Sequence, residues 1–328
     1  MAADGPSAGL TPREAAQLEH LSDPAVRDLA WLLFSPNLLR AQPPAGVLAE
    51  PFESAAEARA TLDWLRAEDA QPDALHRHIA AAQVTRLGRY AECLLAWYLR
   101  HGPAARLIAA NIALRRSGVT IGECDFLVET QTGRRLHWEL AVKCYLHAGD
   151  GRAQLADYVG PNLQDRFDVK QRRLLDHQLP LSARAEFASL GHGGPWDAQM
   201  FVKGWLFYRD GGTPAEPSGI DPAHARGWWT TRADWPGFAA TSAALDGARA
   251  WAVLPRLQWL SRRRRSGDEA AAGLFDIPTL SAQLALHSGP TMVAAFASDD
   301  DAGGWRETSR GFVVPDAWPA QALEFARG

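Results

Sequence analysis

The feature that most constrains this chain is a strict alternation of apolar and polar residues from residue 136 to residue 146. Successive side chains of a β-strand point to opposite faces, so a period of two predicts a strand with two different faces. One face carries the apolar set Trp138, Leu140, Val142, Cys144 and Leu146. The other face carries His137, Glu139, Ala141, Lys143 and Tyr145. We therefore expect one face to belong to the core and the other to be polar.

A second alternating segment covers residues 121 to 129, with Cys124, Phe126 and Val128 on its apolar side and Glu123, Asp125 and Glu129 on its polar side. The residues Gln131-Thr132-Gly133 separate the two segments. A hairpin loop of three residues commonly ends in the left-handed conformation, which suits glycine. The sequence thus predicts an antiparallel hairpin in which Thr130 pairs with Arg134.

This register places the carboxylates of Asp125 and Glu139 opposite each other on the polar face. Like charges directly opposite destabilise a cross-strand pair, so the arrangement needs compensation. A divalent cation would supply it, because a few carboxylates beside a phosphate are the usual protein ligands of Mg²⁺. Lys143, on the same face, would orient water or neutralise developing charge. The competing interpretation is a solvated strand face with a surface ion pair, typically worth only about 0–1 kcal/mol.

The segments around the hairpin predict an α/β fold, in the sense of α+β elements around a mixed sheet. A helix over about residues 85 to 100 carries Glu92, and three strands in a row follow over 107–114, 121–129 and 135–146. A basic amphipathic helix over about 163–179 and a strand over 200–208 come next. The predicted order is therefore helix, three-strand meander, helix, strand.

The segments before and after this core carry different sequence patterns. Helix-start patterns at Thr11, Asp23 and Ser54 predict a helical N-terminal region over residues 1–82, packed on a core over 83–210. Residues 211–328 read as an α/β extension that holds most of the tryptophans. Trp228 and Trp229 indicate core packing rather than a platform that stacks on nucleic-acid bases, and the basic run from Arg262 to Arg265 indicates an exposed loop.

Two levels of resemblance follow from these motifs. The segments GRYAECLLAWYL, GECDFLVE, HWELAVKCYL and GPNLQDRFDVKQRRLLDHQL resemble the bacterial domain-of-unknown-function family 1853, along the full chain. The element order over about residues 84 to 208, with its Gly122-Glu123-Cys124-Asp125 turn into a strand, is similar to the PD-(D/E)XK nuclease superfamily. The resemblance implies a restriction-endonuclease-like core and a nuclease that uses Mg²⁺ or Mn²⁺ on DNA or RNA.

The same resemblance implies roles for individual residues. Asp125 and Glu139 would be metal ligands, Lys143 the catalytic lysine and Glu92 an accessory acid. The chain departs from the superfamily pattern of acid-x-Lys, because Glu139 and Lys143 are four residues apart and Ala141 stands where the second acid belongs. In the deduced register Glu123 faces Ala141, so Glu123 is a third candidate metal ligand that would replace the missing acid.

Several residues near this site have two interpretations. For Glu92, an exposed helix position paired with Arg89 is as good an interpretation as an accessory acid. For Lys170 and Gln171 on the basic helix, a solvated helix face is the favoured interpretation over a contact with phosphate. For His137, a structural role is favoured over a role as a ligand. Only Lys143, Lys170 and Lys203 are lysines among the 34 basic residues, and an ammonium group has a tunable pKa that a guanidinium lacks.

Composition limits the classes of function. The net charge of −4 gives no overall attraction to nucleic acid, so phosphate binding requires a local basic surface. No apolar run is long enough for a membrane span, and the N-terminus carries no secretory pattern, so we expect a cytoplasmic protein. The cysteines Cys93, Cys124 and Cys144 lie in apolar stretches without metal-site spacing and indicate reduced core residues.

Three functions remain open at this point. The first is a metal-dependent nuclease, and the second is a catalytically inactive nuclease-fold module that binds nucleic acid or supports assembly. The third is an unrelated scaffold in which the acidic hairpin is coincidental.

Overall fold

A computed structural model describes residues 10–43, 46–149, 151, 153–266, 272–299 and 304–328. Residue contacts divide the chain into two compact units. The first unit comprises Met1–Lys143, Lys170–Gly204 and Gly219–His224, and the second comprises Cys144–Val169, Trp205–Ser218 and Ala225–Gly328. The chain therefore passes between the units several times. The sequence division at residues 82 and 210 stays a prediction.

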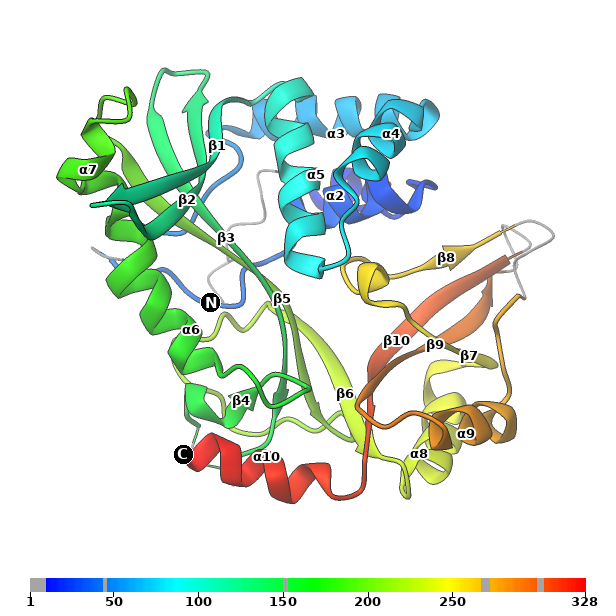
Figure 1. Cartoon of the computed structure of the whole chain (residues 1–328). Coiled ribbons are helices and arrows are strands. Elements are labelled where there is room, and N and C mark those ends of the chain that lie inside the picture. Colours follow the sequence, from blue (N-terminus) through cyan, green and yellow to red (C-terminus); the bar gives the residue numbers. More distant parts are fainter. Residues whose placement is uncertain (1–9, 44–45, 150, 152, 267–271, 300–303) are drawn as a thin grey trace, which may run out of the picture. The chain divides into compact units, whose positions relative to one another are not determined.

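The N-terminal part of the first unit is helical (Figure 1), with α1 at Pro12–Leu18, α2 at Pro24–Phe34, α3 at Ala55–Ala70, α4 at Asp73–Ala82 and α5 at Leu87–His101. The three predicted helix starts are confirmed. The side chains of Thr11, Asp23 and Ser54 each accept a hydrogen bond from a backbone N–H of the first helical turn. Helix α5 carries Glu92 and packs on strand β1.

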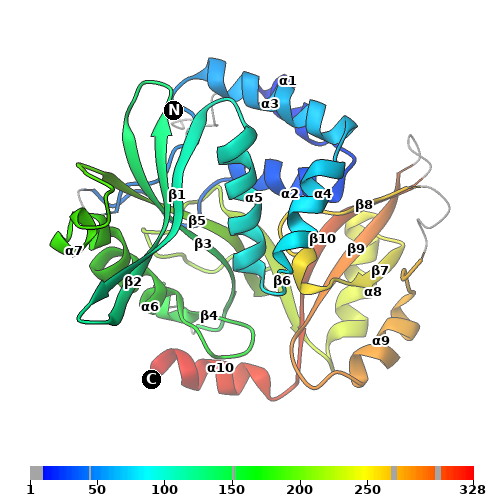
Figure 2. The ribbon, with the colours of Figure 1, turned by 45° about the horizontal axis from the view of Figure 1, so that its top comes forward.

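The three-strand meander is also confirmed. Its strands are β1 (Ala105–Arg116), β2 (Val119–Thr130) and β3 (Arg135–His147), and they lie side by side in Figure 2. Phe126 pairs with Trp138 and Glu129 with Arg135, and the Thr130 N–H donates to the Arg134 carbonyl at 3.0 Å. The hairpin therefore has the register predicted from its loop, and Gly133 takes the expected left-handed conformation with φ +83°.

The basic helix after the meander differs from its prediction. Helix α6 begins at Phe167 and ends at Arg173, whereas a start at Leu163 was expected. Leu163 has φ +53°, outside the right-handed helical region, which explains the later start. The chain continues as a π-helix over Leu174–Gln178 and a 3₁₀ helix over Leu179–Ala183, so the segment up to residue 179 is not one regular α-helix.

Strand β5 (Asp197–Arg209) follows the short helix α7 (Ala185–Ala188) and joins the sheet beside β3, as predicted. The described strands form a mixed sheet in the order β1-β2-β3-β5-β6-β10-β9-β7. Strand β6 pairs in parallel with both β5 and β10. The pairs β1–β2, β2–β3, β3–β4, β8–β10, β9–β10 and β7–β9 are antiparallel. The chain therefore has the mixed α/β fold expected from its sequence.

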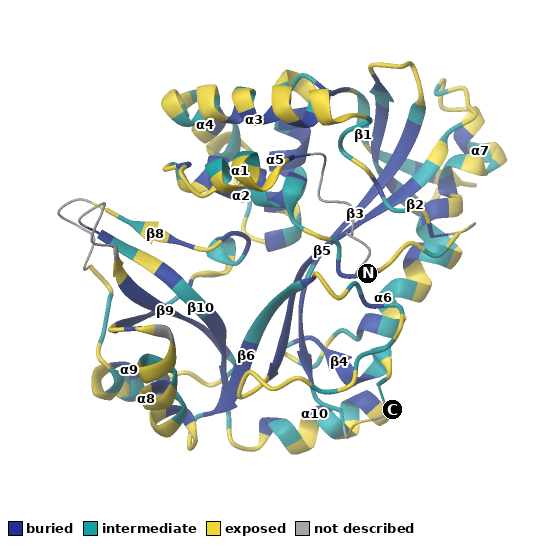
Figure 3. Ribbon diagram, turned by 180° about the vertical axis from the view of Figure 1, so that it is seen from behind, coloured by how far each residue is buried: buried dark blue, intermediate teal, exposed yellow. Residues whose placement is uncertain are grey.

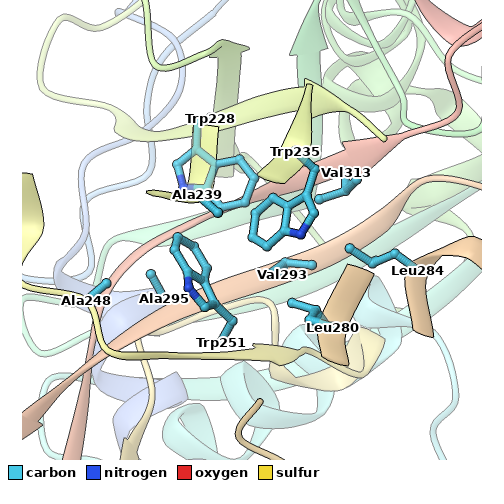
Figure 4. Packing of buried hydrophobic residues seen from close by; sticks show 10 residues of the cluster. All are labelled: Trp228, Trp235, Ala239, Ala248, Trp251, Leu280, Leu284, Val293, Ala295 and Val313. Carbon is cyan, nitrogen blue, oxygen red and sulfur yellow. The ribbon is translucent and has the colours of Figure 1, made fainter. Parts of the chain in front are cut away.

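The second unit contains β4 (Tyr158–Val159), β6 (Ala225–Thr231), α8 (Trp235–Asp246), β7 (Ala250–Val253), β8 (Arg264–Arg265), α9 (Ile277–Ala285), β9 (Thr291–Asp299), β10 (Gly304–Val314) and α10 (Trp318–Arg327). Its core includes a tryptophan cluster, shown in Figure 4. Trp228 stacks on Trp235 with ring centroids 5.8 Å apart, and Trp251 meets Trp235 edge-on at 4.9 Å. These tryptophans are buried, so the core interpretation is confirmed for Trp228.

The basic run in the second unit corrects one expectation. Arg263 is buried, and Arg264 and Arg265 form β8, which pairs with β10. The Arg263 N–H donates to the Glu307 carboxylate at 2.7 Å, so this segment is fixed by a buried acid. The prediction of an exposed loop is therefore wrong for Arg263, which is buried, and Arg264 is exposed as predicted but lies in a strand. Across the described residues, no helix has the length and apolar character needed to cross a membrane.

Candidate metal-binding site

Both faces of strand β3 are buried around Glu139, as Figure 3 shows for most of the strand. The side chains of His137 and Glu139 have 0% exposure. The interpretation of a solvated face is therefore wrong at these two positions. The π-helix and 3₁₀ helix after α6 provide the cover, because Gln178 and Ser182 from these segments bond to the polar side chains of β3.

Glu139 is held by three partners within the first unit. Its Oε1 lies 2.8 Å from His137 Nε2 and 3.4 Å from the backbone nitrogen of Asp125, which donates to it. Gln178 Nε2 donates to the Oε2 atom at 2.6 Å. His137 is fixed in turn, because its Nδ1 lies 3.0 Å from Ser182 Oγ. The carboxylate orientation of Glu139 is therefore set by His137 and Gln178.

Asp125 occupies the next position in the register after the Phe126–Trp138 pair. Its Oδ2 accepts a hydrogen bond from the Leu140 N–H at 2.9 Å. Burial and the negative charge of Glu139 raise the pKa of Asp125 to about 8, although the Leu140 hydrogen bond opposes the rise. The repulsion between the two acids that the sequence predicted is thus present across the hairpin.

Glu92 on α5 forms the expected pair with Arg89 but is not an exposed helix residue, and its role as an accessory acid stays a prediction. Arg89 donates to its Oε2 at 2.6 Å, as a surface ion pair would require, but the Glu92 side chain is only 19% exposed. Burial raises the pKa of Glu92, and the charges of Glu123 and Glu139 add to the rise while Arg89 lowers it. Glu92 therefore belongs electrostatically to the same acidic group as Asp125 and Glu139.

Glu123 lies at the edge of this group. Its side chain is 39% exposed and its Oε1 lies 3.7 Å from Arg89. It affects the site through charge, since it contributes to the raised pKa of Glu92. Its assignment as a metal ligand that replaces the acid missing at Ala141 stays a prediction.

The site contains two lysines rather than one. Lys143 lies half-buried on β3, four residues after Glu139. Burial and the neighbouring charge of Lys143 lower the pKa of Lys170, while Asp125 and Glu139 raise it. The Lys170 Nζ donates to Gln178 Oε1 at 2.8 Å. The interpretation of Lys170 as part of a solvated helix face is therefore wrong, because α6 turns this side chain toward the acids.

Gln178 is the residue that sequence reasoning missed, and it connects Lys170 to Glu139. Residues eight apart on an α-helix differ by about 80° around the axis, since each residue turns about 100°. The π-helix over Leu174–Gln178 has a wider turn, so it absorbs about one extra residue and brings position 178 close to the azimuth of position 170. This local irregularity carries no signal in the apolar periodicity, although the rarity of lysine did point to Lys170.

Cys124 also lies on an unexpected side of the hairpin. It packs with Leu127, Leu181 and Phe187, whereas strict alternation placed it on the side of Phe126. The β2–β3 ladder ends at the Phe126–Trp138 pair, so Cys124 lies beyond the regularly paired stretch of the hairpin. Alternation fails where a strand is irregular.

Two sets of side chains offer metal ligands. One atom each from Cys124, His137 and Glu139, all buried, lies within 4.8 Å of the others, and a sulfur, nitrogen and oxygen set suits Zn²⁺. Three carboxylates, Glu92, Asp125 and Glu139, suit Mg²⁺ or Mn²⁺, but no carboxylate trio among the described residues meets the same spacing. A looser set is compatible with Mg²⁺, which usually keeps several of its waters.

Comparison with family models matches residues 27–314 of the chain to Domain of unknown function (DUF1853). No curated protein and no solved structure matches the chain.

Proposed function

The chain belongs to the DUF1853 family, and we propose that it is a divalent-metal-dependent nuclease that hydrolyses phosphodiester bonds in DNA or RNA. The observation that carries the proposal is the acidic group of the buried Glu139 and the partly buried Glu92 and Asp125, in which Asp125 has a pKa of about 8. Such a strongly shifted carboxylate beside other acids is typical of functional sites. The order of α5, β1, β2, β3, α6 and β5 supports a core of the PD-(D/E)XK type.

Mg²⁺ or Mn²⁺ fits the donor set, because both ions prefer oxygen ligands and the acids lack full compensation by protein groups. Asp125 and Glu139 would hold the ion, with Glu92 as the accessory acid. Such an ion would polarise a phosphate and make a water more acidic. His137 and Gln178 fix the orientation of Glu139 through their hydrogen bonds.

The two ammonium groups would act on the substrate. Lys143 lies on β3 and Lys170 lies on α6. The charge of Lys143 lowers the pKa of Lys170, and the charges of Asp125 and Glu139 raise it. A positioned ammonium stabilises negative charge that develops on a phosphate and orients the attacking water. Gln178 holds the Lys170 ammonium through a hydrogen bond of 2.8 Å, so this cation is positioned before any substrate arrives.

A catalytically inactive nuclease-fold module, which binds nucleic acid or supports assembly, is the second candidate. Both oxygens of Glu139 already have hydrogen-bond partners, and the side chain has 0% exposure. A residue in this state can be a purely structural acid. The hydrogen bonds and burial of Glu139 favour a protein that has kept the nuclease fold and lost catalysis.

Cleavage of single-stranded, double-stranded and branched DNA and RNA, in Mg²⁺, Mn²⁺ or EDTA, tests the proposal. The wild type should cut at least one substrate only when metal is present. Asp125→Asn and Glu139→Gln should each slow cleavage on the order of 100-fold or more. Glu129→Gln is the matched control, because Glu129 lies on the same strand as Asp125 and pairs with Arg106.

The control variant should keep the wild-type rate. Wild-type protein that cuts none of the substrates in either metal, and that neither ion stabilises, would overturn the nuclease proposal.

A further inference from the structure

A pocket of about 620 Å³ lies beside helix α5 in the first unit, and we call it the α5 pocket. Its walls come from the C-terminal half of α4, the segment between α4 and α5, the side of α5 and strand β1. Three arginines line it, and they are Arg86, Arg89 and Arg100. Glu92 is the one acid among its described lining residues. The pocket therefore carries a net positive charge in a chain whose net charge is −4.

Helix geometry places these charges in a stripe. Arg89, Glu92 and Arg100 follow spacings of three and eight residues, which keeps them near one face of α5. The rest of the helix is mostly buried. A rise of 1.5 Å per residue separates Arg89 from Arg100 by about 16 Å along the axis. The stripe thus offers positive groups at both ends of an elongated surface.

The arginines differ in what they already bind. Arg89 donates to Glu92 at 2.6 Å and to Asn111 Oδ1 at 2.9 Å, so its position is fixed. Arg86 and Arg100 are exposed, and neither makes a salt bridge with any residue that the structure describes. These two guanidinium groups are therefore available for an anion from outside, and guanidinium matches phosphate geometry well.

We propose that the α5 pocket binds the phosphate backbone of an unpaired nucleic-acid strand and leads it to the acidic group. The inference rests on the proposed function and names its substrate class. Arg89 and Glu92 make the connection, because both line the pocket, Arg89 lies 3.7 Å from Glu123 Oε1 on β2, and the charge of Glu139 contributes to the raised pKa of Glu92. A strand held along Arg100 and Arg86 would pass Glu92 on its way to Asp125.

The dimensions favour one strand over a duplex. A pocket of 620 Å³ has the size of a small-molecule site, which accommodates a short stretch of single strand but not two paired strands. Its described lining includes no phenylalanine, tyrosine or tryptophan, so none of these rings provides a stacking platform for bases there. Binding should therefore depend on phosphate contacts, tolerate different base sequences and weaken steeply with salt.

Fluorescence anisotropy of a labelled 12-nucleotide single strand, in EDTA so that no cleavage occurs, tests the proposal. A labelled hairpin duplex of equal charge serves as the competing ligand, and DNA and RNA versions of both are compared. Arg86→Ala/Arg100→Ala should weaken single-strand binding on the order of tenfold. The slope of log K against log salt should fall by about 1.4, since each single-strand phosphate contact contributes about 0.7.

Arg59→Ala/Arg66→Ala is the matched control, because it removes the same charge from exposed positions of α3 outside the pocket. It should bind as the wild type does, and both double variants should keep the wild-type melting temperature. Equal binding by the wild type and Arg86→Ala/Arg100→Ala would overturn the proposal. Duplex binding that exceeds single-strand binding and depends on Arg86 and Arg100 would overturn the choice of an unpaired strand.

The binding and cleavage experiments together distinguish the pocket proposal from the nuclease proposal. Strand binding that depends on Arg86 and Arg100, without cleavage in Mg²⁺ or Mn²⁺, would reject the nuclease and keep the pocket as a nucleic-acid site. Metal-dependent cleavage with no effect of the two arginines on binding would reject the pocket and keep the nuclease.

Discussion

Both units bury charged side chains, but they balance the charges differently. In the second unit the buried Arg310 donates from Nε and one terminal nitrogen to the carboxylate of Glu307. Its other N–H groups donate to the carbonyls of Trp259, Leu260 and Ser261. Glu307 also accepts from the Arg263 N–H at 2.7 Å. This pair is therefore matched in charge and saturated with hydrogen bonds.

The acidic group of the first unit is not matched in this way. Asp125 accepts one hydrogen bond from Leu140, yet burial and the charge of Glu139 raise its pKa to about 8. Buried charge alone is therefore a poor indicator of function, because the Arg310–Glu307 pair has a sufficient structural explanation. An excess of like charge is the more informative feature, since it leaves a role for a cation.

Removal of Arg310 should have the largest effect on stability. Arg310→Met leaves Glu307 buried without its cation and should lower the free energy of unfolding by about 3–5 kcal/mol. Urea denaturation followed by tryptophan fluorescence measures the loss. Arg310→Met/Glu307→Leu should recover most of it, and divalent ions should change neither variant. A loss below about 1 kcal/mol would show that the matched pair is not a structural element.

Removal of Lys170, which lies beside the acidic group of the first unit, should have the next largest effect on stability. Lys170→Ala leaves Gln178 Oε1 without its donor and the acids with less positive charge nearby. The metal-free protein should lose about 1–3 kcal/mol of stability, and cleavage should slow on the order of 100-fold. Mn²⁺ should restore part of the stability, because the ion replaces the missing positive charge.

Lys143→Ala removes the other ammonium group of the same site and is compared with Lys170→Ala. It should also abolish efficient cleavage, but it should cost less stability because Gln178 Oε1 keeps its hydrogen bond from Lys170. The two variants are compared by single-turnover cleavage and by melting with and without Mn²⁺. Full activity of Lys170→Ala would mean that this ammonium has no catalytic part.

A pH dependence of stability should appear in the first unit. The pKa of Asp125 rises from 3.8 to about 8 on folding, so between these values the folded state binds a proton that the unfolded state has released. The stabilisation is complete below pH 3.8 and is lost as the pH rises through about 8. Between these limits the slope should reach about 1 kcal/mol per pH unit in metal-free protein.

Asp125→Asn should remove this slope and should stabilise the metal-free protein near pH 8, because an amide can still accept from Leu140 without the charge. Urea denaturation of both proteins at several pH values measures the difference. Parallel pH curves for the wild type and Asp125→Asn would show that Asp125 titrates normally and that the acids do not repel.

The smallest effect should come from the hairpin loop, which sets the register but does not touch the acids. Gly133 has φ +83°, and open space surrounds the position where a Cβ would lie. Gly133→Ala should therefore cost only the backbone strain, about 1 kcal/mol. Its stabilisation by Mn²⁺ should equal that of the wild type. A larger cost, or a lost metal response, would show that the loop also determines the geometry of the acids.

Local rules account for the parts of the fold that the sequence predicted. Alternation and the glycine of a three-residue loop were enough to predict the hairpin register from Phe126–Trp138 to Glu129–Arg135, because a hairpin register depends on neighbouring residues. Lys170 and Gln178 were misjudged or missed because their orientation depends on a π-helix and on the packing of that segment over β3. Cys124 was placed on the wrong side because it lies beyond Phe126, where the pairing of β2 with β3 ends.

The central claim is that the acidic group of the first unit binds a divalent cation through oxygen ligands. Calorimetric titration of Mn²⁺, Mg²⁺ and Zn²⁺ into the wild type, Asp125→Asn and Cys124→Ser tests this binding. We expect one saturable site for Mn²⁺ or Mg²⁺ per chain in the wild type, its loss in Asp125→Asn and its retention in Cys124→Ser. The opposite result, with no heat from either ion or with only Zn²⁺ binding that requires Cys124, would contradict it.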